Sequence, residues 1–282
     1  GGWALESNIG SDQLYTASYS LQNGVPSVSN QLTPLKWNNA GYSAGQIPGF
    51  HVNDASVIKA PGQNWQFMYY TLLDNQFATE ASMTKKNWVG FASSTDGGAT
   101  WFNHGPIIKQ NNGVNMTGAW APSALVESDH IRLYYHTGDK SCLSDNDPCT
   151  HPAVAQPPRV HMSRMANNGW QRLSSHQITD MSGHPLILTN VDVVKNGSKY
   201  YLTGNTPDLL KIELYESSNG IQFKAVGSSS TLISTSQSHW ITTPHLRVLD
   251  KNILEVAFSY HTPTSYGFPM AKSSHTWKVL LP

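Results

Sequence analysis

The sequence has no excess of charge of either sign, because 18 lysine and arginine residues balance 18 aspartate and glutamate residues over 282 positions. Nucleic-acid-binding proteins need a basic surface that displaces counterions from phosphates, and this chain has no such excess. It also lacks a polybasic cluster for anionic membranes. No apolar run approaches the roughly 20 residues that cross a bilayer. We therefore expect neither a nucleic-acid partner nor a membrane span.

The sequence also has little cysteine, with two residues in the chain. Cys142 and Cys149 enclose the turn-forming stretch Leu-Ser-Asp-Asn-Asp-Pro. This proximity favours a local disulfide in an oxidising compartment, with two unpaired surface thiols as the alternative. The first residues show no charged and apolar leader, so a signal peptide has been removed or the initial glycines are a cloning remnant. We expect a secreted or periplasmic monomer.

Helical periodicity is nearly absent, and short strand-like runs separated by turn residues take its place. Four hairpins share one pattern: a short apolar strand, a tight polar turn, and a strand rich in tyrosine or phenylalanine. They cover residues 55–72, 123–136, 191–203 and 245–260. A second hairpin with an Asp/Asn-Gly turn follows three of them, at 91–101, 162–170 and 215–223. Hairpin plus hairpin makes a four-stranded blade, and its repetition predicts a β-propeller.

The ends of the chain supply the remaining strands, at residues 14–21 and 277–281. A fifth blade closed by both termini would cover two edges that would otherwise stay open. No linker or change in composition divides the chain. The sequence therefore predicts an all-β, five-bladed β-propeller that spans residues 1–282 as a single domain.

Several phrases resemble the five-bladed propeller glycoside hydrolases, namely family 43 and its relatives, which include the fructosidases and anhydro-galactosidases. These phrases are Asn-Asp-Ala-Ser-Val-Ile-Lys at 53–59, Ala-Trp-Ala-Pro-Ser at 119–123, Val-Asp-Val at 191–193 and Thr-Pro-His-Leu at 243–246. They occur in the order of the family's blades. The resemblance implies hydrolysis of a poly- or oligosaccharide with inversion, at a site on the propeller axis.

Glycoside hydrolysis needs a base or nucleophile and a proton donor on either side of the scissile bond. By resemblance, Asp54 is the general base that activates water. Asp192 is the third acidic residue, which orients the substrate and raises the pKa of the donor. The alternative for each aspartate is a turn or a strand cap.

The proton donor departs from the family pattern. Thr242 or Thr243 stands where the family has a glutamate, and a threonine hydroxyl is too weak an acid to donate at neutral pH. His245 has three possible roles: the acid, since imidazole titrates near neutrality and the anhydro-galactosidase relatives use a histidine; a ligand of an axial cation or water; or a structural residue. We expect no required cofactor, with Ca²⁺ or a similar cation on the axis as the possible exception.

Aromatic and histidine side chains are expected to bind the sugar, because sugar C–H faces stack on aromatic planes while polar neighbours bind the hydroxyls. The candidates flank the proposed starts of the inner strands and are Phe50, His51, Trp120, His136 and Trp240. Trp101 and Trp170 are instead predicted to pack inside their blades. The alternative function is a catalytically degenerate propeller that binds glycans without hydrolysing them.

Overall fold

The computed structural model describes residues 2–6, 9–16, 19–22, 25–28, 33–42, 50–74, 87–108, 118–138, 157–236, 239–263 and 269–281. Within these residues the chain is all-β and contains no helix. It accordingly has no helix that is long and apolar enough to cross a membrane in the part described. Cys142 and Cys149 lie outside the described residues, so the disulfide stays a prediction.

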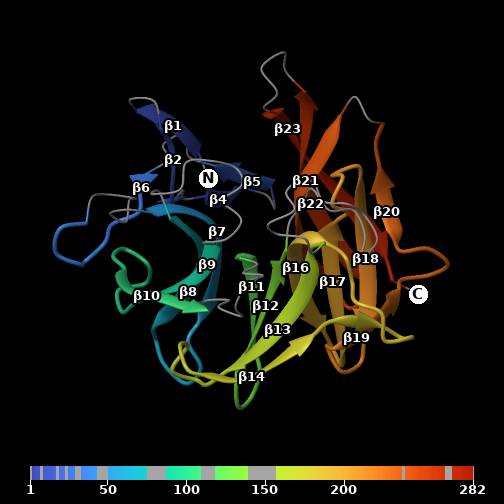
Figure 1. Cartoon of the computed structure of the whole chain (residues 1–282), viewed down its shortest axis with the longest axis horizontal. Helices are drawn as coiled ribbons and strands as arrows, with labels where there is room; N and C mark the ends of the chain where they lie inside the picture. The colour runs from blue at the N-terminus through green and yellow to red at the C-terminus, as the bar shows by residue number, and fades with distance from the viewer. Residues whose placement is uncertain are drawn as a thin grey trace.

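Four sheets form the blades of a β-propeller (Figure 1). Blade I contains β7 (Phe50–Lys59), β8 (Gln66–Asp74), β9 (Asn87–Ser94) and β10 (Phe102–Ile108). Blade II contains β11 (Ala119–Val126), β12 (Ile131–Thr137), β13 (Arg159–Met165) and β14 (Arg172–Gln177). Their antiparallel order follows the chain, as the repeated hairpins predict.

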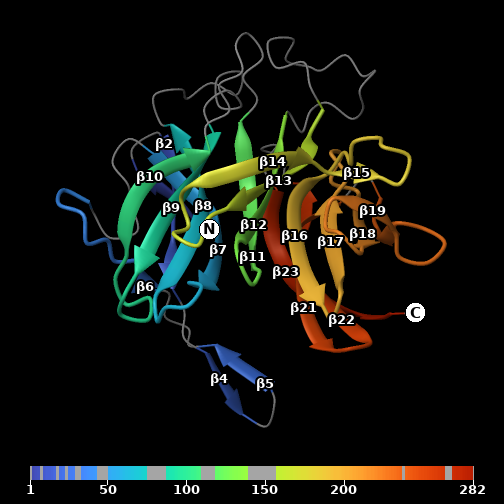
Figure 2. The same ribbon diagram turned by 90° about the horizontal axis from the view of Figure 1, so that it is seen from below.

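The other two blades depart slightly from this plan. Blade III contains β16 (Thr189–Asn196), β17 (Lys199–Asn205), β18 (Lys211–Ser217) and β19 (Gln222–Ala225). Two further strands join it: β15 (Thr179–Asp180) pairs with β19, and β20 (Thr231–Ser234) pairs with β18. Blade IV has three described strands, β21 (Trp240–Asp250), β22 (Ile253–Pro263) and β23 (Pro269–Leu280). The inner strands β7, β11, β16 and β21 lie next to one another in this order (Figure 2).

The N-terminal part forms small separate sheets. The pairs are β1 (Gly2–Glu6) with β2 (Ile9–Gln13), β3 (Tyr15–Thr16) with β6 (Thr33–Pro34), and β4 (Tyr19–Gln22) with β5 (Val25–Val28). The single strand predicted at 14–21 is therefore wrong, because its two halves pair with different partners. At the other end, Trp277 lies in β23, which completes blade IV by pairing with β22. The assignment of residues 277–281 to a fifth blade is therefore wrong, and the existence of a fifth blade stays a prediction.

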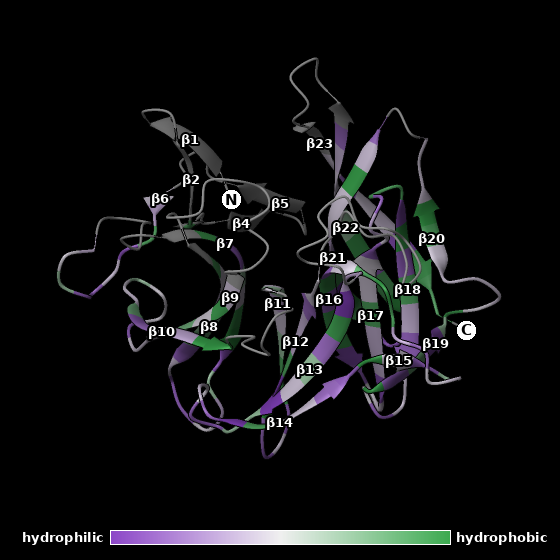
Figure 3. Ribbon diagram, viewed as in Figure 1, coloured by the Kyte–Doolittle hydropathy of each residue, from purple (hydrophilic) through white to green (hydrophobic). Residues whose placement is uncertain are grey.

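The core consists of apolar clusters between adjacent blades, and Figure 3 shows hydrophobic segments within the strands of every blade. Three of the repeated hairpins carry a pair of adjacent tyrosines, at 69–70, 134–135 and 200–201. Tyrosines of the first two pairs connect the blades as well as filling this core. The buried Tyr69 donates a hydrogen bond to the Gly169 carbonyl of blade II at 3.0 Å. Tyr134 makes the corresponding bond to the Gly220 carbonyl of blade III at 2.9 Å. Each of these hydrogen bonds gives a buried tyrosine hydroxyl its partner and helps to fix the orientation of the next blade.

Candidate active site

Each inner strand has a β-bulge at the same place. The register with the neighbouring strand shifts between Asn53 and Ser56, and at the equivalent steps of β11, β16 and β21. One non-glycine residue in each bulge has a positive φ, between 45° and 50°; these residues are Asp54, Ala121, Asn190 and Thr243. A backbone in this region is strained and persists only where the surrounding contacts hold it in place. Such strained residues are common at functional sites. The four bulges therefore define equivalent positions around the axis.

In blades I, II and III, the residue two positions beyond the bulge residue accepts a hydrogen bond from a backbone N–H of the next blade. The Ser56 hydroxyl accepts a hydrogen bond from Ala124 N at 3.1 Å, and the Ser123 hydroxyl accepts one from Val193 N at 3.0 Å. Asp192 accepts the third, from Leu246 N at 2.7 Å. The equivalent residue of blade IV is His245. Asp54 and Asp192 are therefore not equivalent: Asp54 is a bulge residue, whereas Asp192 occupies the connecting position.

Asp192 receives three hydrogen bonds. Besides Leu246 N, Ser123 Oγ donates to Oδ1 at 2.6 Å, and His245 Nδ1 lies 2.7 Å from Oδ2. The Asp192 side chain is 15% exposed, whereas that of His245 is 72% exposed. The hydrogen bond to Asp192 and its negative charge raise the pKa of His245 above its ordinary value, although partial loss of hydration beside the cavity wall and the charge of Arg247 oppose this. Asp192 thus orients an accessible imidazole and favours its charged form.

Asp54 is oriented by a different group. Thr71, which is fully buried on β8, accepts a hydrogen bond from Ala121 N at 2.9 Å. With its lone pair engaged by that amide, the Thr71 hydroxyl donates to Asp54 Oδ2 at 3.4 Å. This hydrogen bond helps to fix the orientation of the Asp54 carboxylate.

Asp54, Asp192 and His245 line one cavity, whose volume is about 390 Å³. Residues of all four inner strands contribute to its wall, among them Ser123, Asn190 and Thr243. The three predicted catalytic residues are therefore brought together, although 191 positions separate Asp54 from His245 in the sequence. No lysine or arginine lines this cavity within the described residues.

The predicted aromatic and histidine residues are placed less uniformly. Trp120 stacks on the buried His136, with ring centroids 6.2 Å apart, beside the bulge at Ala121. Trp240 is partly buried at the start of β21, where it pairs with His261 of β22. The backbones of Phe50 and His51 begin β7, while their side chains lie outside the described part of the structure.

The two tryptophans assigned to blade packing differ. Trp101 is buried, with 3% of its surface exposed, and donates to the Gly98 carbonyl at 3.1 Å. Trp170 is 48% exposed, so its assignment to the interior of a blade was wrong. The backbone N–H of Trp170 donates to Asn168 Oδ1 at 3.2 Å within the turn.

The cavity residues do not fit a metal centre. Within the described residues, no group of three or more His, Cys, Asp or Glu side chains is arranged to hold an ion. Both oxygens of Asp192 already accept hydrogen bonds, and His245 Nδ1 is engaged by Asp192. A cation would have to displace these bonds.

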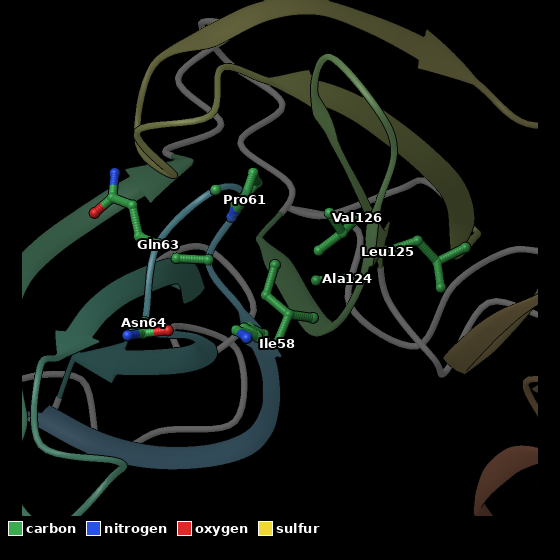
Figure 4. A pocket seen from close by; sticks show the side chains of 10 residues that line it. Ile58, Pro61, Gln63, Asn64, Ala124, Leu125 and Val126 are labelled. Atoms are coloured by element: carbon green, nitrogen blue, oxygen red, sulfur yellow. The ribbon is translucent and has the colours of Figure 1, made fainter.

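A second hollow, of about 680 Å³, lies between the β7–β8 turn and the end of β11 (Figure 4). Its wall is mostly apolar or amide, including Ile58, Asn64 and Leu125. Lys59 is the one ionisable residue among those that line it. The described residues that line this hollow include no carboxyl pair for glycoside chemistry, whereas the cavity at the four bulges, called the axial cavity below, has Asp54 and Asp192.

Sequence reasoning missed Thr71, Ser123 and Asn190. Ser123 ends the quoted phrase Ala-Trp-Ala-Pro-Ser, but its position two residues beyond a bulge, which Ser56, Asp192 and His245 share, is visible only in the structure. Thr71 lies in the tyrosine-rich second strand of the first hairpin, and only the pairing of β7 with β8 places it beside Asp54. Asn190 precedes the quoted Val-Asp-Val phrase and occupies the position equivalent to Asp54.

Neither a family model nor a curated protein sequence matches the chain. Solved structures do match in fold. An N-acetylgalactosamine deacetylase from F. plautii, solved with blood group B trisaccharide, has a TM-score of 0.53 and 14% identity over 90% of this chain and 79% of its own. An α-L-arabinofuranosidase from Lactobacillus brevis has a TM-score of 0.57 and 9% identity over 82% and 74%. A family 117 glycoside hydrolase from Zobellia galactanivorans has a TM-score of 0.51 and 13% identity over 93% and 76%. The chain thus shares the propeller fold found in carbohydrate-active enzymes.

Proposed function

We propose that the protein is a glycoside hydrolase that cleaves a poly- or oligosaccharide in the axial cavity, with inversion at the anomeric carbon. The observation that carries this proposal is the convergence of Asp54, Asp192 and His245 on one cavity. Two of the similar structures are glycosidases by name, which supports the same chemistry. The deacetylase shows that the fold alone does not specify the reaction.

In this proposal Asp54 is the general base. Its carboxylate takes a proton from a water molecule, which attacks the anomeric carbon as the glycosidic bond breaks. Thr71 orients this carboxylate through its hydroxyl, which itself accepts a hydrogen bond from Ala121 N. A positioned general base contributes about 10² to 10⁴-fold to the rate.

His245 is the general acid. Its Nδ1 faces Asp192, which leaves Nε2–H as the donor toward the leaving oxygen. Because Asp192 raises the pKa of His245, the imidazolium persists to a higher pH than an isolated histidine would. The raised pKa also widens the pH range in which a protonated His245 coexists with an ionised Asp54.

The second candidate function is glycan binding without hydrolysis. The observation that favours it is the residue at the position where the resemblance implies a glutamate donor. That residue is Thr243, a bulge residue with a φ of 49°, and its side chain has no acidic group. The three donors to Asp192 also fit a purely structural connection between blades.

A product screen separates the two functions. Arabinan, agarose oligosaccharides and levan represent plant, algal and bacterial glycans, and an aryl α-L-arabinofuranoside tests the smallest substrate. Hydrolysis predicts new reducing ends from at least one of them, and proton NMR of the first product would show the inverted anomer. Binding to a glycan with no product from any of them would establish the lectin-like function instead.

A further inference from the structure

The outer edge of blades I and II carries an aromatic surface that lies away from the axial cavity. Trp170, in the turn between β13 and β14, stacks on His104 of β10, with centroids 5.7 Å apart and planes at 21°. Phe102 contacts the same imidazole edge-on at 5.1 Å. Trp170 and Phe102 are 48% and 47% exposed. Figures 1 and 2 place this turn beside β10, at the opposite side of the blades from the inner strands β7 and β11.

The rings are held in place from below. Phe91, which is fully buried, contacts both His104 and Trp170, with centroids 5.0 and 6.1 Å away. His104 Nε2 is hydrogen-bonded to Ser93 Oγ at 2.8 Å. The Trp170 turn is anchored by the Tyr69 hydrogen bond to Gly169, where a Cβ would approach Phe91 to 2.5 Å. An indole fixed in this way loses little conformational entropy when a ligand binds.

We propose that Trp170, His104 and Phe102 form a second carbohydrate-binding site, which holds a polysaccharide chain while the axial cavity acts on it. One indole face is occupied by His104, and the half-exposed ring presents the remainder of its surface to solvent. A sugar ring can stack its C–H face there, and the exposed side chains of Gln171 and Arg172 lie next in the chain to bind its hydroxyls. The ligand class rests on the proposed function.

A protein partner fits this surface poorly. A stable protein interface covers about 800 Å² on each partner and needs several buried anchors. Two half-exposed rings beside one imidazole supply a platform for one or two sugar units instead. The small area also predicts weak binding to a single sugar and appreciable binding only to a polymer, through many equivalent positions.

Affinity electrophoresis tests this proposal with linear arabinan, levan or agarose cast in native gels. The Asp54→Asn background keeps the polymer intact during the run. We expect at least one polymer to retard the parent, and Trp170→Ala to weaken that affinity about 2- to 10-fold. Trp170→Phe should retain most of it. Trp65→Ala is the matched control, because Trp65 is 41% exposed on the β7–β8 turn, and it should behave like the parent.

A second measurement keeps this proposal separate from the function of the axial cavity. Turnover of an aryl glycoside, which cannot reach both sites, should be the same in Trp170→Ala and the wild-type enzyme. Equal retardation of Trp170→Ala and the parent by every polymer, or no retardation of the parent by any, would overturn the outer site. Retardation that depends on Trp170 would support it even if no glycan were hydrolysed.

Discussion

The imidazole of His245 lies 2.7 Å from the carboxylate of Asp192, across the boundary between blades III and IV. Asp192 is also held by Ser123 of blade II and by Leu246 N of blade IV, so one carboxylate connects three blades. The geometry makes Asp192 a positioning residue for His245. It links the integrity of the propeller to the chemistry proposed at its axis.

This relationship predicts a pH shift. Asp192 raises the pKa of His245, so Asp192→Asn should lower it, and the acid would lose its proton at a lower pH. The alkaline limb of kcat/KM should therefore move toward lower pH. Arg247 has the opposite effect on His245, and Arg247→Gln should move that limb toward higher pH. A uniform loss of activity in both variants, with no change in the shape of the pH profile, would contradict the assignment.

His245→Gln tests the acid directly. Glutamine keeps a polar side chain but cannot donate the required proton, so the loss of kcat should grow as the leaving group becomes more basic. Aryl glycosides with an acidic phenol need little protonation and should lose the least. A Brønsted plot of rate against leaving-group pKa measures this dependence. An equal loss for all leaving groups would show that His245 acts only by binding or structure.

Thr71→Val removes the hydroxyl that connects Ala121 N to Asp54 with nearly the same shape. Asp54 would then be less well oriented, and we expect kcat to fall about tenfold with little change in KM. Thr71→Ser keeps the hydroxyl and should restore most of the rate. If the valine variant instead loses thermal stability and the serine variant is no better, Thr71 serves the fold alone.

The contact between blades II and III predicts that alanine lowers the stability of the protein more at Gly220 than at Gly227. Gly220 has a φ of +71°, and a Cβ there would lie 2.3 Å from Arg132 Nη1 and 2.7 Å from the Tyr134 hydroxyl. Gly227 has a φ of +79°, with nothing within 4 Å of its Cβ position. Gly227→Ala should therefore cost about 1 kcal/mol from backbone strain, and Gly220→Ala about 1–3 kcal/mol more from the clash. Urea unfolding compares them, and equal losses would contradict the packing described at Gly220.

The sequence was sufficient to predict the four observed blades, because each repeat carries its own strand pattern and turn residues, and three of the four carry a tyrosine pair. It also placed Asp54 and Asp192 at the inner strands, since resemblance fixed their order. It could not show that the two aspartates occupy different positions, because the bulge depends on a positive φ at Ala121 and Thr243, residues that rarely adopt it. Nor could it show that Thr71 faces Asp54, which depends on strand register, or that Trp170 is exposed. These features arise from contacts between strands and between blades, which local patterns do not encode.

Asp54→Asn is the most direct test of the central claim that this cavity hydrolyses a glycosidic bond with Asp54 as the base. The amide keeps the shape of the carboxylate and cannot take a proton from water. With a substrate identified by the product screen, we predict that kcat falls by about 10² to 10⁴-fold. Calorimetric affinity for a short oligosaccharide of that glycan should change little. Turnover that persists unchanged in Asp54→Asn would show that the reaction takes place elsewhere and would contradict the account.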